Sequence, residues 1–310
     1  MMSAMRPMLA TPTTDTPVGE GWVHEVKWDG VRVLVDVADG ATRMLSRNGN
    51  LVTAAWPDLS AAPLGDRDLL VDGEVIALND RGIPDFRVLQ HRMHVRKVAD
   101  AARLAEQIPA TLMTFDLLRL DGEDLTGRPL AERRDLLAGL GLAETRWQVP
   151  AAYDDGQMLW EATGRQGLEG VVSKRLGSRY RFDTRSKDWL KRAHRHRGSF
   201  VVGGWRPQVG TSDRLAAVLV GEVTAGGLAY RGRVGSGLTG VGARRLQEML
   251  EPLHAATSPF VDEVPRVDAQ GTTWVEPIVV VDIDTHGLGY DRLRQPSFQG
   301  VRSDLTPEDL

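Results

Sequence analysis

The stretch EVKWDGVR, Glu25 to Arg32, places a lysine between Val26 and Trp28 in an extended, valine-rich segment and then turns at Asp29-Gly30. Because Asp-Gly is a strong turn signal, we expect Lys27 to face an open space. A free lysine has a pKa of about 10.4 and becomes nucleophilic only where burial or neighbouring cations favour the neutral amine. Lys27 is therefore either an exposed strand residue that precedes a hairpin or a reactive amine.

The composition limits the classes of protein to which the chain can belong. Its 310 residues are 42% hydrophobic and 26% charged, which is typical of a globular protein with two domains. The absence of cysteine excludes disulfides and thiolate zinc sites. No apolar run approaches the roughly 20 residues that cross a membrane, and the N-terminus does not resemble a signal peptide.

The distribution of charge is uneven. The net charge of −4 argues mildly against a nucleic-acid-binding protein. However, the segment from Lys174 to Arg197 is crowded with lysine and arginine and contains only two aspartates. Such a segment is either a solvated basic loop or a surface that faces phosphate groups, and composition does not choose between them.

The hydrophobic pattern predicts a mixed α+β chain with two domains. In the first part we expect strands at 31–38, 69–78, 111–120 and 171–176, a helical run from Phe86, and a helix at 130–140. After Arg197 we expect short strands at 199–205, 215–223, 227–237 and 273–283, interrupted by a helix at 241–250. About five strands and one helix suit a small β-barrel such as an OB-fold. The predicted domains are 1–197 and 198–310, joined by a short hinge.

Two carboxylates lie in the middle of apolar strand segments. DGEV at 72–75 contains Glu74, and LEGVVSK at 168–174 contains Glu169. A buried carboxylate is costly unless it is paired or binds a metal, although both side chains could simply point to water. Taken together with Lys27 and several cations, these carboxylates suit a nucleoside triphosphate with magnesium.

These segments, in this order, resemble the motifs of ATP-dependent DNA ligases in the covalent nucleotidyltransferase superfamily. The matching segments are KWDG with Arg32, SRNG (46–49), DGEV, FDLL with Phe115, LEGVVSK, DWLK with Lys191, and LRQPSFQGVRSD (293–304). The flanking text, including DGEVIALNDRGIPDFRVLQHR and GRVGSG, is similar to the ligase module of bacterial ligase D. The resemblance covers nearly the whole chain and implies an adenylation domain followed by an OB-fold domain.

The resemblance also implies a reaction in three steps. Lys27 would attack the α-phosphate of ATP, which gives a lysyl-AMP and pyrophosphate. The AMP would pass to the 5′-phosphate of a nick in duplex DNA. The adjacent 3′-hydroxyl would then displace AMP, because AMP provides the good leaving group that the phosphate monoester lacks.

Each motif residue has a role that the resemblance implies. Lys27, Asp29, Arg32 and Lys191 would be catalytic, and Lys191 would neutralise the α-phosphate and lower the pKa of Lys27. The nucleotide-binding residues would be Glu25, Val26, Arg47, Glu74, Phe115, Lys174, Arg302 and Asp304. Glu74 and Glu169 would hold Mg²⁺ or Mn²⁺.

Within this set, several contacts are more specific. Phe115 would stack on adenine, and Glu25 would lie near its exocyclic amine. Arg32 and Arg47 would contact the phosphate of the nicked strand. Arg302 and Asp304 would close over ATP when the second domain swings in, and the basic segment would help to hold the duplex. Without the family pattern, Phe115 would be interpreted as a core residue and Arg47 as a turn arginine.

Two positions depart from the family pattern. The phosphate motif usually has a second lysine two residues after the first, where this chain has Ala193. The last motif usually ends in Asp-Lys, whereas Asp304 is followed here by Leu305. Because both missing lysines serve the triphosphate, we expect slower self-adenylation than in a typical member, with sealing less affected.

Other functions remain open at this point. The chain could be an RNA ligase or a capping guanylyltransferase of the same superfamily, a DNA-binding module that has lost catalysis, or an aldolase-like enzyme with Lys27 as a Schiff-base lysine. For the ligase, we expect nicked duplex DNA as substrate and the Ku end-binding protein with other end-joining proteins as candidate partners. We expect a monomer in the cytoplasm, associated with the nucleoid.

Overall fold

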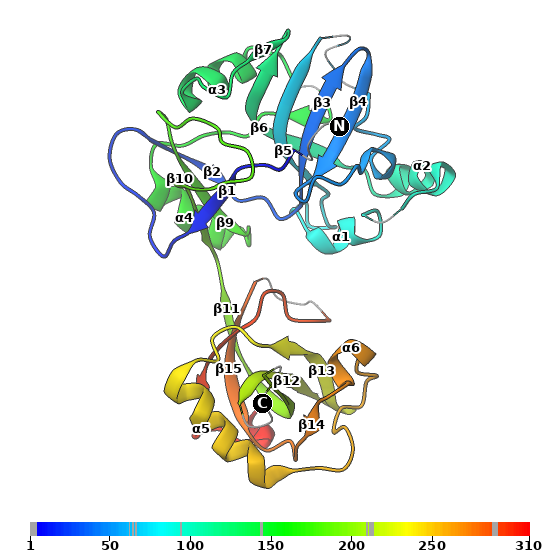
Figure 1. The fold of residues 1–310 in the computed structure, drawn as a ribbon, viewed down its shortest axis with the longest axis vertical. Coiled ribbons are helices and arrows are strands. Elements are labelled where there is room, and N and C mark those ends of the chain that lie inside the picture. Colours follow the sequence, from blue (N-terminus) through cyan, green and yellow to red (C-terminus); the bar gives the residue numbers. More distant parts are fainter. Residues whose placement is uncertain are drawn as a thin grey trace. The chain divides into compact units, whose positions relative to one another are not determined.

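The chain folds into two compact units, Met1–Ala193 and His194–Leu310, in a computed structural model (Figure 1). The structure describes residues 5–61, 63, 65, 67–93, 95–142, 145–208, 210, 214–286 and 291–310. The predicted domain boundary at residue 197 lies a few residues further on, within β11 (His196–Pro207). No described helix is both long enough and apolar enough to span a membrane.

The first unit contains two sheets. The larger has the order β4-β3-β5-β6-β7, with β8 beside β6, and the smaller has the order β1-β10-β9-β2. The strands of the larger sheet are β3 (Val31–Ala38), β4 (Ala41–Ser46), β5 (Leu69–Ile76), β6 (Thr111–Leu120), β7 (Glu123–Asp124) and β8 (Trp147–Gln148). Those of the smaller sheet are β1 (Leu9–Pro12), β2 (Trp22–Val26), β9 (Gly170–Arg175) and β10 (Arg185–Ala193).

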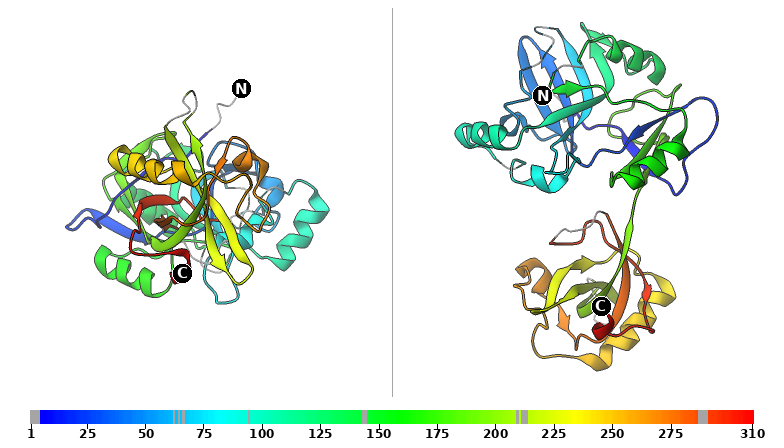
Figure 2. Two further views of the ribbon diagram at one scale, coloured as in Figure 1. Left: turned by 90° about the horizontal axis from the view of Figure 1, so that it is seen from below. Right: turned by 180° about the vertical axis from the view of Figure 1, so that it is seen from behind.

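Short helices cover these sheets. They are η1 (Thr53–Ala55), α1 (Phe86–Gln90), α2 (Val98–Gln107), α3 (Leu130–Ala138) and α4 (Gly156–Arg165). Helix α3 packs against β6, and α4 packs against β2 and β9, as the view from behind also shows (Figure 2). The catalytic candidates therefore come from strands and their connections rather than from helices.

The alternation of side chains along β3 explains how the two sheets meet. Val33 and Val35 point into the larger core, which also contains Trp56 and Trp147. Because successive strand residues point to opposite faces, Arg32 and Leu34 lie on the other face. There Leu34 joins a second buried cluster, whose members are Met8, Leu34, Leu70, Phe115, Leu118, Tyr180 and Trp189. This cluster takes residues from both sheets and holds them together around the candidate site.

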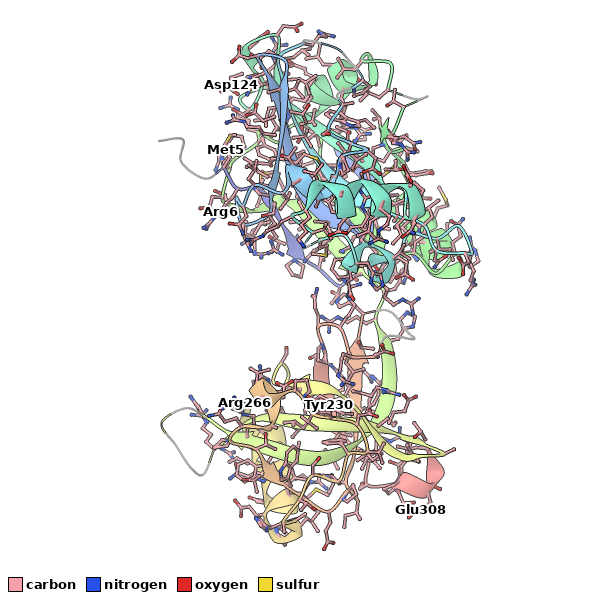
Figure 3. All side chains as sticks on the ribbon, turned by 90° about the vertical axis from the view of Figure 1, so that its right-hand side faces the viewer. Met5, Arg6, Asp124, Tyr230, Arg266 and Glu308 are labelled. Carbon is pink, nitrogen blue, oxygen red and sulfur yellow. The ribbon has the colours of Figure 1, made fainter. Side chains whose placement is uncertain are left out.

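The second unit is built on one six-stranded sheet. Its order is β13-β12-β11-β15-β16, with β14 beside β11. The remaining strands are β12 (Leu215–Thr224), β13 (Gly227–Val234), β14 (Thr273–Trp274), β15 (Val280–Thr285) and β16 (Ser297–Val301). The helices are α5 (Gly240–Leu250), η2 (Glu251–Leu253), α6 (Arg266–Ala269) and η3 (Pro307–Asp309). Helix α5 contributes Leu246 and Leu250 to one core, and Tyr230, labelled in Figure 3, is fully buried in another.

This sheet is an OB-fold that is not a fully closed barrel. Within the described residues its edge strands β13 and β16 meet only at an isolated bridge between Ser236 and Ser297. Strand β13 ends at Val234, and the chain then turns at Gly237, whose φ is +83°. A Cβ at Gly237 would lie 2.2 Å from the carbonyl oxygen of Phe298, so this turn requires glycine.

Two predicted elements differ from the structure. The helical run from Phe86 is divided into α1 and α2. Between them the buried Arg92 donates to Asp58 at 2.5 and 3.0 Å, and this inward ion pair fixes the direction of the chain. The predicted strand at 273–283 is divided into β14 and β15, because Pro277 has no N–H to continue a ladder.

Candidate active site

Lys27 lies in the connection that crosses from one sheet to the other. It follows the last residue of β2, and Asp29-Gly30 lead directly into β3, so this turn joins two sheets rather than closing a hairpin. The Lys27 amide donates a hydrogen bond of 2.8 Å to the carbonyl oxygen of Gly170 at the start of β9. A Cβ at Gly30 would lie 2.2 Å from the carbonyl oxygen of Val75, so glycine is needed for this close approach.

Lys27 is paired with one of the predicted carboxylates. Its Nζ forms an ion pair with Glu169, and the two side chains are 19% and 12% exposed. Gly170, which follows Glu169, has φ of +144°, and a Cβ there would lie 2.2 Å from the carbonyl oxygen of Arg192. This glycine lets β9 pack tightly against β10 and so sets the position of Glu169.

Further cations surround this pair. Burial lowers the pKa of Lys191, and the positive charges of Lys27, Arg185 and Arg47 lower it further. Lys191 is half-buried on β10, whereas Arg47 is exposed at the turn after β4. These positively charged side chains repel one another. A bound polyphosphate would reduce the repulsion through its negative charge, so the cluster is well placed to bind one.

Glu74 faces the same region from β5. Burial raises the pKa of Glu74 to about 8, and Glu169 and Asp72 add to the rise, whereas Arg32 and Lys27 oppose it. Glu74 therefore holds a proton at neutral pH unless another cation approaches. The described residues contain no group of three potential metal ligands. A pair of carboxylates nonetheless fits Mg²⁺, which commonly binds one or two carboxylates together with phosphate oxygens.

Arg32 is held by a buried hydrogen-bond network. Its Nε and Nη2 atoms donate to the two carboxylate oxygens of Asp72 at 2.5 and 2.6 Å. The Tyr180 hydroxyl donates to Asp72 at 2.6 Å and accepts a hydrogen bond of 3.0 Å from the Met8 amide. Burial disfavours the guanidinium charge, but Asp72 outweighs it and raises the pKa of Arg32. Arg32 thus has little freedom to turn toward a ligand.

The Phe115 ring is covered by two cations. The Arg32 guanidinium lies 4.5 Å from the ring centroid, and the Lys174 amine lies 4.2 Å from it. Trp189 approaches the ring in a T-shaped arrangement with centroids 6.2 Å apart. Phe115 is only 6% exposed. In this arrangement no face of Phe115 is open to a stacking base.

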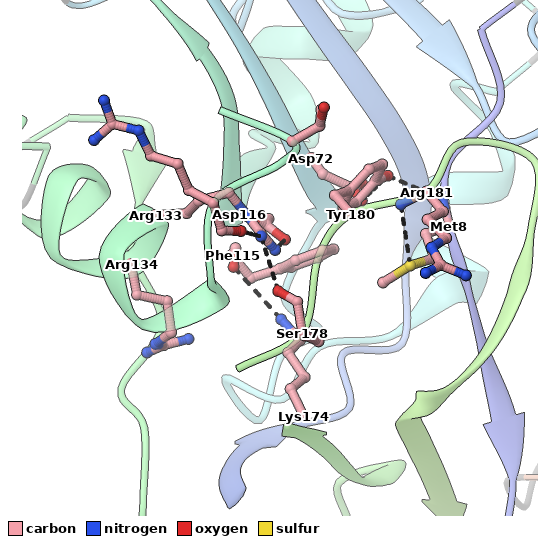
Figure 4. A network of polar contacts seen from close by, with 12 residues as sticks. Met8, Asp72, Phe115, Asp116, Arg133, Arg134, Lys174, Ser178, Tyr180 and Arg181 are labelled. Atoms are coloured by element: carbon pink, nitrogen blue, oxygen red, sulfur yellow. Dashed lines mark hydrogen bonds and ion pairs between the residues drawn. The ribbon is translucent and has the colours of Figure 1, made fainter. Parts of the chain in front are cut away.

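Lys174 is in turn paired with Glu25. Its Nζ donates to Glu25 Oε2 at 2.7 Å, and Arg134 from α3 pairs with the other oxygen of Glu25. Burial, reinforced by the charge of Arg134, holds the pKa of Lys174 well below its usual range. Figure 4 shows Lys174 beneath the Phe115 ring, with Arg134 reaching in from α3. Glu25 and Lys174 are both 2% exposed.

The remaining predicted residues are placed as follows. Val26 ends β2 and is half-buried, and the Asp29 carboxylate accepts a hydrogen bond of 3.3 Å from the Phe86 amide at the start of α1. Arg302 and Asp304 lie in the second unit, where they form a two-bond ion pair with both distances 2.8 Å. They are therefore not part of the cluster that the first unit builds around Lys27.

Sequence reasoning missed four residues of this site: Asp72, Arg134, Tyr180 and Trp189. Asp72 was placed within the predicted strand at 69–78 but was given no role in the site, and it lies inside β5 at a bulge between Asp72 and Gly73. The hydrogen bond between Asp72 on β5 and a tyrosine from the basic segment leaves no local pattern, because Tyr180 and Asp72 are 108 residues apart. A buried aspartate within an apolar strand was the one signal that could have indicated a partner.

Comparisons with known proteins found matches in both units of the chain. Residues 7–192 match the family described as the ATP dependent DNA ligase domain, and residues 211–305 match the ATP dependent DNA ligase C terminal region. The chain is 37% identical over 311 residues to the multifunctional non-homologous end joining DNA repair protein LigD of Mycobacterium tuberculosis. It is 35% identical over 314 residues to the corresponding LigD of Pseudomonas aeruginosa.

The relatives are longer than this chain, and the solved structures match it throughout. The matches cover 99% and 98% of the chain but only 39% and 36% of the M. tuberculosis and P. aeruginosa proteins. The ligase domain of M. tuberculosis LigD has a TM-score of 0.58 and 36% identity, with 100% of this chain and 99% of that chain covered. A mycobacterial DNA ligase D complexed with ATP and MES has a TM-score of 0.59.

Proposed function

Since the chain belongs to the ATP-dependent DNA ligase family, we propose that it seals 5′-phosphate/3′-hydroxyl nicks in duplex DNA through a lysyl-AMP on Lys27. The observation that carries the proposal is the position of Lys27, which is fixed between two sheets beside Glu169 and among the charges of Lys191, Arg185 and Arg47. Such a lysine can attack a phosphate whose negative charge is offset by its neighbours.

In the first step the neutral Lys27 amine forms a bond to the α-phosphorus of ATP and releases a proton to solvent, and the bond to pyrophosphate breaks. Lys191 and Arg47 offset the charge that develops on the phosphate oxygens. Before this step, while Lys27 is still protonated, Glu169 keeps the Lys27 side chain directed into the site through their ion pair. In the later steps the AMP moves to the 5′-phosphate at the nick, and the 3′-hydroxyl displaces it.

The nucleobase site must open for this chemistry. Adenine can stack on Phe115 only if the Lys174 amine leaves the ring, which it now covers at 4.2 Å. Glu25 would then exchange its bond to Lys174 for one to the exocyclic amine of adenine. We propose that ATP binding drives this exchange, and that Arg32 stays on the opposite face because Asp72 holds it.

The metal that we propose for this site is Mg²⁺ or Mn²⁺, held by Glu74 and Glu169 together with phosphate oxygens. When bound, it would neutralise phosphate charge. The raised pKa of Glu74 supports this assignment, because an added cation beside two facing carboxyls would favour their ionised forms.

The biological setting is proposed from the relatives. Two of them are named as end-joining proteins, so we propose that the chain acts in the repair of double-strand breaks, with Ku as a candidate partner. We also propose that residues 1–197 carry adenylation, and that Arg302 and Asp304 of the second domain act on the triphosphate. A monomeric protein associated with the nucleoid remains our expectation.

The test is a sealing assay on a nicked duplex with a labelled 5′-phosphate at the nick. We expect sealing with ATP and magnesium, none with GTP, and none on a duplex whose nick carries a 5′-hydroxyl. A duplex with an RNA strand at the nick separates the RNA-ligase function, which would favour that substrate. Nucleotide transfer from GTP instead of ATP would indicate a capping enzyme, and binding without sealing would indicate a non-catalytic module.

A further inference from the structure

A basic pocket lies beside the site, within the first unit. It has a volume of about 510 Å³ and lies between the end of β9 and the start of β10. Five cationic side chains and one carboxylate line it: Arg175, Arg179, Arg181, Arg185, Lys187 and Asp188. Asp188 is paired with Arg175 at 3.3 Å. Within the described residues Arg179, Arg181 and Lys187 have no carboxylate partner, so the pocket carries an excess of positive charge.

The loop that bears these cations is firmly anchored. The Ser178 carbonyl accepts hydrogen bonds from the Leu130 amide at 2.9 Å and from the buried Arg133 at 3.0 Å. The Tyr180 amide donates to the Thr126 carbonyl at 3.0 Å, and its hydroxyl donates to Asp72. Ser178 and Tyr180 point inward, while Arg179 and Arg181, which alternate with them, are exposed. The cations are thus presented by a fixed backbone rather than by a free loop.

The pocket wall also contains a hydrogen-bond donor that has no acceptor. The Ser178 hydroxyl is buried and lacks a hydrogen-bond partner within the described residues. Buried polar groups are normally paired, and a rotation of this side chain toward the pocket would let an anion accept its proton. Excess positive charge and an unpaired donor both indicate an oxyanion as ligand.

The pocket is continuous with the cations around Lys27. Arg185 lines the pocket, and it is also one of the residues whose charge acts on Lys191. Along β1, Leu9 pairs with Arg185 and Pro12 with Lys191. These three residue steps correspond to roughly 10 Å, which is about the distance between backbone phosphates one or two nucleotides apart on one DNA strand.

From this geometry we propose that the pocket binds one phosphodiester group of the DNA backbone, about one or two nucleotides from the nick, through Arg179, Arg181 and the Ser178 hydroxyl. The proposal rests on the proposed ligase function and adds a second fixed point for the duplex. Two fixed points, one at Lys191 and one in the pocket, would set the register of the nick over Lys27. Because the contact is to phosphate, it should be salt-sensitive and independent of base sequence.

The experiment combines neutralisation of single phosphates in the DNA backbone with substitution of pocket residues in the full-length protein chain. Nicked duplexes carry a single uncharged methylphosphonate at one of the six nucleotides on either side of the nick. Their affinities are measured for the wild type, for the Arg179→Gln/Arg181→Gln variant, and for Arg103→Gln as control. Arg103 is an exposed arginine of α2, with 58% of its side chain accessible. The rate of lysyl-AMP formation is measured in parallel.

We expect one methylphosphonate, at the first or second phosphodiester from the nick, to weaken wild-type binding about tenfold. The double variant should bind unmodified DNA more weakly and with a salt slope reduced by about two, and that same methylphosphonate should cause no further loss. Arg103→Gln should behave as the wild type does. A Ser178→Ala variant should also bind DNA more weakly while its thermal stability is maintained, because the hydroxyl that it loses is unpaired.

Equal methylphosphonate profiles in the wild type and the double variant would overturn the proposal. So would a double variant that keeps its DNA affinity and loses lysyl-AMP formation, because the pocket would then serve the triphosphate. Both results leave the ligase function standing if the wild type still seals nicks. If the wild type neither binds nor seals nicked DNA, the proposed function itself fails, and the pocket assignment fails with it.

Discussion

The protonation of Glu74 makes the stability of the folded protein depend on pH. Burial raises its pKa from 4.5 to about 8, so the folded protein holds a proton there that the unfolded chain releases. The unfolded state therefore binds fewer protons between these two values, and this residue's contribution to stability declines as the pH rises from about 4.5 to 8. Above pH 8 its contribution no longer changes.

We accordingly predict that Glu74→Gln removes this decline. The variant should match the wild type near pH 4.5 and become more stable than it by on the order of 4 kcal/mol at pH 8, because glutamine has no proton to lose. Urea unfolding at several pH values measures the difference. A difference between the two proteins that stays constant from pH 4.5 to 8 would mean that Glu74 is ionised throughout.

Replacing Glu25 should destabilise the protein more than replacing Lys174, because the two substitutions leave different charged groups in the buried network. Glu25→Gln leaves the buried Lys174 without its carboxylate, and we expect it to cost about 3 kcal/mol. Lys174→Met keeps the Glu25–Arg134 pair and places a flexible apolar chain beside Phe115 and Trp189, so we expect a cost of about 1 kcal/mol. Chemical denaturation of both variants tests the order, and an equal or reversed order would refute this account of the network.

Among the elements, strand β9 positions Glu169, the proposed metal ligand, through Gly170. A Cβ at Gly170 would overlap the carbonyl of Arg192, and φ is in a region that L side chains rarely adopt. We predict that Gly170→Ala costs roughly 3 kcal/mol and slows lysyl-AMP formation, because Glu169 shifts.

The matched control for this change is Gly127→Ala, where a Cβ meets nothing within 4 Å. Its effect on stability should stay within about 0.5 kcal/mol, with an unchanged rate of lysyl-AMP formation. Unfolding and α-labelled ATP assays cover both variants. If alanine is tolerated equally well at the two positions, the close contact between β9 and β10 does not set the position of Glu169.

The elements also show what a sequence can predict. Strands β3 and β6 were predicted with their observed bounds, because segments rich in apolar and β-branched residues fix them locally. The helical run from Phe86 was predicted as continuous, since nothing local indicates that Arg92 turns inward to Asp58. The motif residues of the site could be named from their family pattern. Asp72, Tyr180 and Arg134 could not, because their partners lie far away in the chain.

At the scale of the whole molecule, the net charge did not indicate which partner the protein can bind. The net charge is −4, yet Lys27, Lys191, Arg47 and Arg185 act on one another in the first unit. Local clustering therefore decides which partner the protein can bind. The chain also spans only about two fifths of the length of the curated relatives it matches, so its place in a repair pathway depends on tests with the full set of partners.

The two positions that depart from the family pattern, Ala193 and Leu305, lie in different units. Leu305 packs against a core of the second unit, so Leu305→Lys should lose about 1.5 kcal/mol of stability. Ala193 ends β10, is half-buried and pairs with Gly170, so its side chain is close to the site.

For Ala193 we predict that Ala193→Lys speeds lysyl-AMP formation on the order of tenfold by adding a cation near the phosphates. Ala193→Met is the uncharged control of similar length, and single-turnover labelling with ATP measures both variants. Equal rates for the lysine and methionine variants would show that the missing charge does not limit self-adenylation.

The measurement that tests the central claim most directly is labelling with α-labelled ATP and magnesium, followed by denaturing electrophoresis. It compares the wild type, Lys27→Ala and Lys97→Ala, since Lys97 is an exposed lysine at the start of α2. All samples are first treated with pyrophosphate to remove any AMP already bound. We predict a labelled band in the wild type and in Lys97→Ala, and none in Lys27→Ala. A band that persists in Lys27→Ala, or a wild type that stays unlabelled, would contradict Lys27 as the nucleophile of this protein.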